Sequence, residues 1–305
     1  MNWLVSQESS LYLTAGCDRT GVDPVGTETS QLVLNESNRL VSPMRELERD
    51  DIPSPLSTPL TVVGRGRVGG SLAAAAERAG AQVSLVSHQQ PAETVPAAAV
   101  LLCVPDEQIA ATAERFADAS PSLLGHTSGA TTLDALAAAA ERGIATFSLH
   151  PLQTFADGET PTEGTPAAIA GSSENSLTYA RGLAEVLGMR PFEVPEESRA
   201  AYHAAAAMAS NLLVALEESA AELMQSIGVE DARELLAPLV LRTAANWAER
   251  GPEALTGPIA RGDRATVQRH RAAVAESAAE LVRLYDVLAM RAEAMAWESV
   301  HEASS

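Results

Sequence analysis

Apolar and polar positions follow two different rhythms along the chain, with a change near residue 195. Before it, short apolar runs typical of buried strands alternate with stretches whose apolar residues recur every three to four positions. The runs predict strands over 60–64, 81–87, 98–105, 122–129, 144–151, 166–172 and 190–195. The other stretches predict helices over 68–80, 106–119, 131–143 and 173–188. Strands that alternate with helices indicate an α/β fold with a doubly wound, mostly parallel sheet.

Beyond residue 195 the apolar runs stop, and only the helical period remains. The pattern predicts helices over 196–228, 230–251, 264–276 and from there to about residue 297. Pro238 should kink or split the second of these helices, because proline cannot donate the helical hydrogen bond. We therefore expect an α/β domain over 58–195 and an all-helical domain over 196–305.

Residues 1–57 differ from the rest of the chain. They are rich in Ser, Thr, Asn, Asp and Glu, and their apolar residues show little periodicity. Such a segment lacks the apolar surface that a packed core requires. We expect a disordered extension, or a start codon assigned too early, since Met44 lies shortly before the first strand.

The composition narrows the possible functions. The 305 residues carry a formal net charge of −19, and all 21 basic residues are arginine. Without lysine, a Walker-type phosphate loop, a Schiff-base lysine and a lysine general acid are excluded. The acidic balance disfavours nucleic acid and anionic membranes as partners. Cys17 and Cys103 share no metal-ligand spacing, and no apolar stretch reaches the roughly 18 residues of a membrane span. We expect a soluble cytoplasmic protein without a metal.

A glycine-rich stretch, VVGRGRVGGS at residues 62–71, joins the first predicted strand to the first predicted helix. This context is typical of a dinucleotide-binding turn, in which Gly64 allows the tight turn, Gly66 admits the pyrophosphate and Gly69 lets helix and strand pack closely. The alternative is a tight turn without a ligand. We expect a pyrophosphate at the start of the helix, bound by Gly64, Arg65, Gly66, Arg67, Val68 and Gly69.

The end of the second predicted strand indicates which dinucleotide binds. NAD sites usually place Asp or Glu there to bind the ribose 2′-hydroxyl. This chain has Ser87 and His88 instead, and the next acid is Glu93. A 2′-phosphate would be attracted by these two residues and by Arg65 and Arg67. We therefore expect NADP(H); the alternative is that one or both arginines face solvent.

Ligands of doubly wound sheets bind beyond the carboxyl ends of the strands, and three of these ends carry candidate residues. Those expected to line the dinucleotide path are Val104, Pro105, Thr127 and Gly129, with Ser128 near the substrate. The third end, SLHPLQTF, places His150 and Gln153 where they could contact a substrate carbonyl or carboxylate. The alternative for His150 is a structural histidine, and the favoured interpretation of Asp106 is a helix cap.

Polar residues interrupt the Ala-rich stretch after residue 196. His203 and Ser210 are seven positions apart and share a helical face, and Asn211 lies one step round. They form either a buried polar seam or the wall of a substrate pocket, which we favour. In the loop LTGPIARGD, Arg261 is a candidate for binding a substrate carboxylate. The alternative there is an Arg261 ion pair, with Asp263 as a helix cap.

Six motifs resemble, in chain order, those of Rossmann-like proteins with a C-terminal DUF2520 domain: GRGRVGGSLA, LLCVPDEQIA, GHTSGA, SLHPLQTF, YHAAAAMASNLLVAL and LTGPIARGD, over about residues 59–295. That family is similar to the β-hydroxyacid dehydrogenase, pyrroline-5-carboxylate reductase and ketopantoate reductase superfamily. The resemblance implies an NADP-binding domain and a helical domain like the C-terminal domain of 6-phosphogluconate dehydrogenase, through which the chain forms a homodimer. It implies hydride transfer from NADPH to a small carbonyl or imine. Ketopantoate is the favoured substrate, and a cyclic imine or a prephenate-like acid is the alternative.

One departure from the resemblance concerns the proton donor. Related dehydrogenases use a lysine one helical turn before an asparagine, which would be Asn211 here, and the lysine's place is taken by Ala207. Protonation of the nascent alkoxide then falls to His203 or His150, with Asn211 or Ser128 hydrogen-bonded to its oxygen. The second hypothesis is a nucleotide-binding regulator without turnover, which the missing lysine favours.

Overall fold

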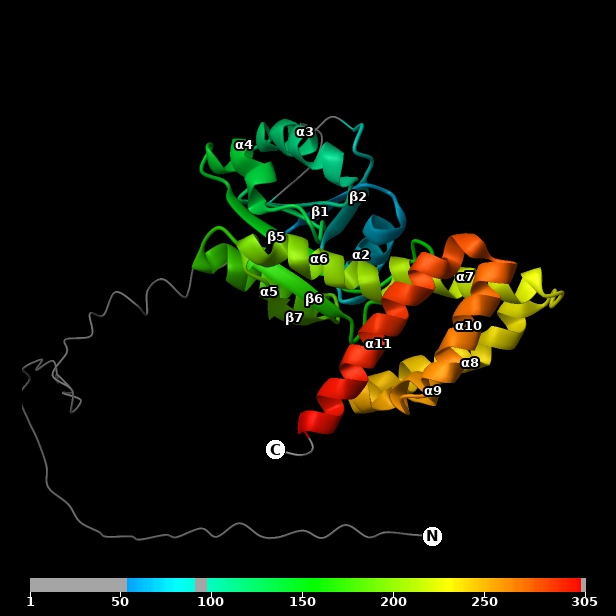
Figure 1. Cartoon of the computed structure of the whole chain (residues 1–305). Coiled ribbons are helices and arrows are strands. Elements are labelled where there is room, and N and C mark those ends of the chain that lie inside the picture. Colours follow the sequence, from blue (N-terminus) through cyan, green and yellow to red (C-terminus); the bar gives the residue numbers. More distant parts are fainter. Residues whose placement is uncertain (1–53, 91–97, 303–305) are drawn as a thin grey trace, which may run out of the picture. The chain divides into compact units, whose positions relative to one another are not determined.

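The computed structural model describes residues 54–90 and 98–302, without the side chains of 299–302. Residues 1–53 of the expected N-terminal extension lie outside the described residues. The described chain consists of a sheet with helices on both faces, followed from Glu196 onward by helices alone (Figure 1).

In the part of the chain that the structure describes, the sheet is built from seven short strands. They are β1 (Leu60–Val63), β2 (Val83–Val86), β3 (Ala99–Leu102), β4 (Leu123–His126), β5 (Ala145–Pro151), β6 (Pro166–Gly171) and β7 (Arg190–Glu193). The helices among them are α2 (Arg67–Arg78), α3 (Asp106–Ala117), η2 (Leu133–Leu136), α4 (Ala137–Ala140) and α5 (Glu174–Val186). The strand order is β2-β1-β3-β4-β5-β6-β7, and every pair except β5 with β6 is parallel. This confirms the predicted doubly wound, mostly parallel fold.

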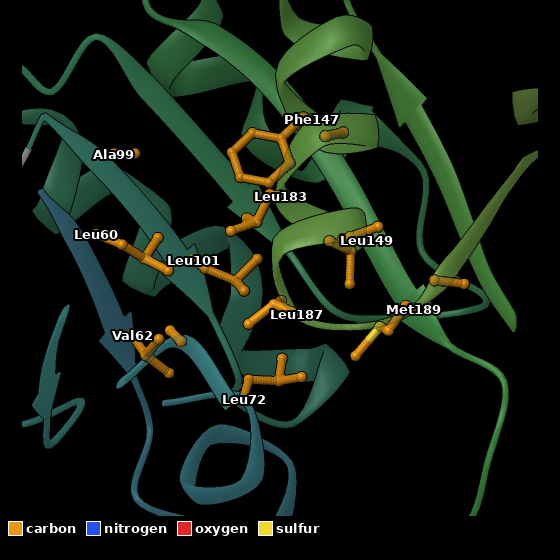
Figure 2. Close-up of a cluster of buried hydrophobic side chains, with 14 of the residues drawn as sticks. Leu60, Val62, Leu72, Ala99, Leu101, Phe147, Leu149, Leu183, Leu187 and Met189 are labelled. Atoms are coloured by element: carbon orange, nitrogen blue, oxygen red, sulfur yellow. The ribbon is translucent and has the colours of Figure 1, made fainter. Parts of the chain in front are cut away.

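Strands β1 and β3 are buried throughout because both faces of the sheet are covered, and Thr61 is the one polar residue of the two strands. In β3, Leu101 packs into a cluster with α2 and α5, whereas the next residue, Leu102, packs with α3 and α4 on the opposite face. Figure 2 shows the first cluster, in which Leu72 of α2 and Leu183 of α5 lie with Leu101. Successive side chains of a strand point to opposite faces, so one short strand contributes to two cores.

The sheet reverses direction after β5. Strand β6 pairs antiparallel with β5, from Phe147 opposite Gly171 to Pro151 opposite Ala167. The loop 152–165 therefore leaves and re-enters the sheet at the edge where the parallel strands β1 to β5 end. The sequence indicated that β6 extends the sheet, but not that it runs antiparallel.

The helices differ from the prediction at three places, two of them in the helical part. Its elements are η3 (Glu196–Ser198), α6 (Arg199–Ala209), α7 (Asn211–Ser226), α8 (Ala232–Arg250), η4 (Gly251–Ala254), α9 (Gly257–Ala260), α10 (Arg264–Ser277), η5 (Ala279–Leu281) and α11 (Val282–Glu302). The expected single helix over 196–228 is wrong, because Ser210 leaves the helical conformation at φ −129° and ψ −80°. Its hydroxyl donates to the carbonyl of Ala206 at 2.8 Å, a side-chain bond that competes with the helical backbone.

The other two differences concern helix continuity. Helix α8 runs through Pro238 without being split, so the helix tolerates the lost backbone bond. The expected helix over 131–143 is replaced by η2 and the single turn α4. The amide of Leu133, at the start of η2, donates to the Glu196 carboxylate at 2.6 Å, and this long-range bond fixes the segment in a tighter turn.

The helices from α6 onward bury few side chains within this chain. Among their described residues, only Arg199, Ala221, Ala232 and Val274 are buried. Large apolar side chains on these helices are instead exposed, among them Met208, Leu212, Val214, Leu235, Leu239, Leu241, Trp247, Val287, Met290 and Trp297. Exposed apolar side chains that gather on one surface mark candidate interaction sites.

Candidate functional site

The glycine loop lies where the chain leaves β1 and β3 on opposite sides, the position at which doubly wound folds bind ligands. Gly64 has a φ of +117°, and a Cβ there would lie 2.2 Å from the carbonyl oxygen of Cys103. A Cβ on Gly69 would lie 1.9 Å from the carbonyl oxygen of Gly64. Both glycines are therefore required by the packing of the chain itself.

Gly66 is different. Its backbone is ordinary, with φ −76° and ψ −176°, and a Cβ there would meet no atom within 4 Å. Nothing in the packing or conformation of the described chain requires glycine at this position, which borders open space at the start of α2. Helix α2 has no acid in its first turn, whereas α3 begins with Asp106 and Glu107. The free amides and the helix dipole of α2 thus favour an anion in this space.

The groups at the end of β2 are cationic or neutral. Arg65 Nη2 donates to the carbonyl of Leu85 at 3.3 Å, which places the guanidinium beside the end of that strand. Arg115 donates to the carbonyls of His88 and Gln90 at 2.7 and 3.1 Å. Residues 87–90 contain no carboxylate, and Glu93 lies outside the described residues. These groups fit a phosphorylated ribose better than a free 2′-hydroxyl.

Two adjoining cavities lie beyond the strand ends. The smaller, of about 220 Å³, is lined by the ends of β3 and β4, including Val104, Thr127 and Gly129. The larger, of about 840 Å³, lies between Arg67 of α2, the loop after β5, and Ser210 and Asn211 at the break between α6 and α7. Residues that line both are Val68, His150, Gln153, Phe155 and His203. The two histidines thus stand where the cavities meet.

His150 is held by a neighbour from the helical part. Its Nδ1 atom lies 2.7 Å from the hydroxyl oxygen of Tyr202, and the two rings meet edge to face at 5.6 Å. The ring of His203 lies 5.9 Å from that of His150. A Cβ on Gly129 would lie 2.9 Å from His150 Nε2 and 2.7 Å from His203 Cδ2, so glycine there lets both rings approach the end of β4.

Burial sets the protonation states of His150 and Tyr202. It lowers the pKa of His150 to about 4, and the charges of His203 and Arg199 act in the same direction. Burial also raises the pKa of Tyr202 to about 12. At neutral pH His150 is therefore an uncharged imidazole beside an un-ionised phenol.

Arg199 joins the helical part to the sheet and is entirely buried. Its Nε donates to Glu196 Oε1 at 2.8 Å and its Nη1 to the carbonyl of Ser128 at 3.1 Å, while Nη2 donates to the hydroxyl of Ser148. Tyr202 and His203 follow three and four positions later, on the same face of α6. This clamp fixes where α6 presents both rings.

Several predicted residues already have partners within the chain. The hydroxyl of Ser128 accepts from the amides of Ala130 and Thr131 at 3.2 and 3.0 Å. Gln153 donates to the carbonyl of Pro161 at 2.9 Å and accepts from Thr165 at 2.6 Å. Both residues border the cavities, but these bonds give each a role in shaping a loop. Pro105 caps α3 and does not line either cavity.

Arg261 is not brought to the histidines within one chain. It lines a separate hollow with Glu293 and Trp297, formed by α9, α10 and α11. Asp263 caps α10, since its carboxylate accepts from the amide of Thr266 at 3.0 Å.

Sequence reasoning overlooked Arg199 and gave Tyr202 no role. A signal was present, because Arg199, Tyr202 and His203 follow the helical spacing of three and four within an otherwise Ala-rich segment. Nothing in the sequence, however, indicated which of these side chains is buried.

In residues 54–90 and 98–302 no three His, Cys, Asp or Glu side chains are grouped to hold a metal ion. None of the described helices is both long and apolar enough to cross a membrane.

Residues 165–292 match the family model described as a domain of unknown function, DUF2520, which confirms the resemblance over that range. Among curated protein sequences, none matches the chain. Solved structures show the same fold at low identity. Protein TM1727 from Thermotoga maritima is 23% identical, with a TM-score of 0.65, and the match covers 79% of this chain and 99% of that one.

A protein from Bacteroides fragilis, named provisionally as an NADP oxidoreductase, has the same identity and coverage and a TM-score of 0.64. Pyrroline carboxylate reductase from Plasmodium falciparum, solved with NADP bound, is 13% identical, with a TM-score of 0.52 and coverage of 79% and 99%. Both establish likeness of fold.

Proposed function

We propose that this chain, whose residues 165–292 form a DUF2520 domain behind a dinucleotide-binding sheet, is an NADPH-dependent reductase of a small oxo acid or imine. The proposal rests on Gly66. It is a glycine that the chain does not need for its own packing, placed beside the free amides of α2, where a diphosphate would leave no room for a Cβ. Structures of similar fold that hold NADP support the same conclusion.

The residues present fit NADPH at both ends. The loop from Gly64 to Gly69 holds the diphosphate, and Arg65, Ser87 and His88 hold the 2′-phosphate. Val104, Thr127 and Gly129 line the smaller cavity, which receives the nicotinamide half. When bound, the cofactor supplies a hydride.

The larger cavity favours an anionic substrate. Although the chain carries a net charge of −19, no Asp or Glu lines this cavity, and Arg67 does. The hydroxyl of Ser210 and the amide of Asn211 add hydrogen-bonding groups at its far wall. A 2-oxo acid such as ketopantoate fits this lining, with its carboxylate toward Arg67 and its carbonyl oxygen toward His150. A cyclic imine that bears a carboxylate is the alternative.

His150 and His203 take the place of the missing lysine. They stand where the two cavities meet, so either can reach an oxygen that gains negative charge during reduction. His150, uncharged at neutral pH, donates a hydrogen bond rather than carrying a charge.

The homodimer belongs to the same proposal. The exposed apolar side chains of α8, with Leu239 63% and Trp247 63% exposed, face a second copy of the helical part. A symmetric dimer would cover the same surface on both copies. Arg261, which follows α9, is in this dimer the residue that we propose to approach the partner's cavity.

Substituting Gly66→Ala tests cofactor binding directly. The free energy of unfolding should not fall, while NADPH affinity, measured by calorimetric titration, should fall by at least about tenfold. Arg65→Ser should weaken NADPH binding and leave NADH binding unchanged. Gly182→Ala, in α5 and away from the loop, serves as the binding control.

Turnover is tested on the wild-type chain with a panel of 2-oxo acids and cyclic imines, followed by the absorbance of NADPH. Oxidation of NADPH with one of these acids supports the reductase. No association with either nicotinamide coenzyme would refute the whole proposal. Tight binding without turnover across the panel would refute the reductase in favour of a nucleotide-binding regulator.

A further inference from the structure

We propose that Tyr202 is a positioning residue, which fixes the proton of His150 on Nε2 and resupplies it in each turnover. The inference rests on the proposed reductase function for the turnover step. It concerns, among residues 54–90 and 98–302, the one direct hydrogen bond between the helical part and a candidate catalytic side chain of the sheet.

Packing fixes the direction of the Tyr202 hydroxyl. Phe192 of β7 meets the Tyr202 ring edge to face at 5.9 Å on one side, and His150 meets it at 5.6 Å on another. One helical turn earlier, Arg199 anchors α6 to Ser128 and Ser148. The 2.7 Å separation between the hydroxyl and Nδ1 is therefore set by three elements of the fold.

The hydrogen-bond partners of Tyr202 indicate the tautomer of His150. Throughout the described residues, the Tyr202 hydroxyl has no partner other than His150, so Nδ1 is the acceptor that the described chain offers its single proton. A neutral imidazole that accepts at Nδ1 carries its own proton on Nε2. The opposite arrangement, with Nδ1 donating to the phenol, would leave the phenolic proton without an acceptor among the described residues.

The Nε2 side of the ring faces the cavities. This atom lies 2.9 Å from the place that a Gly129 Cβ would occupy, and no side chain or backbone group of the described chain hydrogen-bonds to it. A substrate carbonyl at the junction of the cavities would find an N–H donor there.

The surroundings keep His150 uncharged before the reaction. The groups that face it are His203 and Arg199 of α6, Asp106 of α3 and the un-ionised Tyr202; His203 and Arg199 lower the pKa of His150 and Asp106 raises it. Burial lowers the pKa of His150 further, so the neutral ring carries one proton before the reaction. Once this proton is transferred, the ring must take up another.

In the proposed reduction, His150 supplies the proton. As the carbonyl carbon gains the hydride, the π electron pair of the C=O bond moves to oxygen, and oxygen takes the proton from His150 Nε2. The Tyr202 hydroxyl passes its proton to Nδ1, which keeps the imidazole neutral and leaves a phenolate. When the product leaves, water entering the open cavity gives a proton to Nε2, and Nδ1 returns its proton to the phenolate, which restores the starting tautomer.

The test compares two tyrosines of the same chain. Tyr202→Phe removes the hydroxyl that reaches His150, while Tyr179→Phe removes a buried hydroxyl of α5 that makes no hydrogen bond. Long-range ¹H–¹⁵N spectra of ¹⁵N-histidine-labelled protein report the tautomer without cofactor or turnover. His150→Gln assigns the signal.

We expect His150 to carry its proton on Nε2 in the wild type and in Tyr179→Phe, and to lose this single tautomer in Tyr202→Phe. Once a substrate is known, kcat should fall about 10- to 100-fold in Tyr202→Phe, with the Kd for NADPH unchanged. A wild-type His150 protonated on Nδ1, or a Tyr202→Phe variant that keeps the Nε2 tautomer, would overturn the inference. Because the spectra need no turnover, that result is independent of whether the chain is a reductase.

Discussion

Replacing Arg199 with methionine tests how the helical part is joined to the sheet. The methionine keeps most of the aliphatic volume and removes the guanidinium, which is fully buried and makes three hydrogen bonds. The carbonyl of Ser128 would lose this donor and stay buried. The hydroxyl of Ser148 can rotate to another acceptor, so it contributes less.

The magnitude follows from those three partners. A buried acceptor left unsatisfied costs about 1–3 kcal/mol, and removing one member of a buried ion pair costs about 3–5 kcal/mol. The side chain of Glu196 is 34% exposed and keeps its bond to the Leu133 amide, which reduces the second cost. We expect the free energy of unfolding to fall by about 3 kcal/mol.

Urea unfolding, followed by far-UV circular dichroism at one fixed protein concentration, measures this change. The control is Arg233→Met, because Arg233 makes a two-pronged ion pair with Glu218 that is exposed to solvent. That variant should show no measurable change. If Arg199→Met were as stable as the control, burial of the guanidinium would not be what joins α6 to the strands.

Two further predictions concern pH and assembly. Burial, with Arg199 nearby, lowers the pKa of His126 from 6.5 to about 4. As the pH drops, the unfolded chain therefore binds a proton at this histidine before the folded chain does. The free energy of unfolding should fall by up to about 3 kcal/mol between pH 6.5 and pH 4. Urea unfolding across this range should show a shallower loss in His126→Asn, and an equal loss would contradict the assignment. In sedimentation experiments, Leu235→Glu combined with Leu239→Glu should convert a dimer to monomers, whereas Leu56→Glu before β1 should not; a dimer that survives the double substitution would place the interface elsewhere.

The sheet could be predicted from the sequence because each strand is recognised from its own residues. Strands buried on both faces are mostly apolar, and Gly64 and Gly69 of the first turn are required by contacts within a few residues or with the end of the adjacent strand. The resemblance to DUF2520 proteins was likewise carried by short motifs. These signals survive without knowledge of the tertiary structure.

The site was harder to predict because it depends on long-range partners. Ser210 ends α6 although Ala-rich, helix-favouring sequence stands on both sides of it. Ser128 and Gln153 were expected to meet ligands, yet their side chains bond to nearby loop atoms. The burial of Arg199 depends on Ser128 and Ser148, more than 50 positions away in the sequence.

Because the sheet reverses direction after β5, the loop between β5 and β6 lies beside the two cavities. The loop 152–165 supplies Leu152, Thr154 and Phe155 to the larger cavity, and it is braced on α2, where Ser71 donates to the carbonyl of Asp157 at 3.3 Å. The same loop also supplies Gln153 and Phe155 to the smaller cavity, whereas Leu152 and Thr154 line the larger cavity and not the smaller one. If the proposed function holds, Leu152 and Thr154 are therefore the positions to randomise in a search for new substrates.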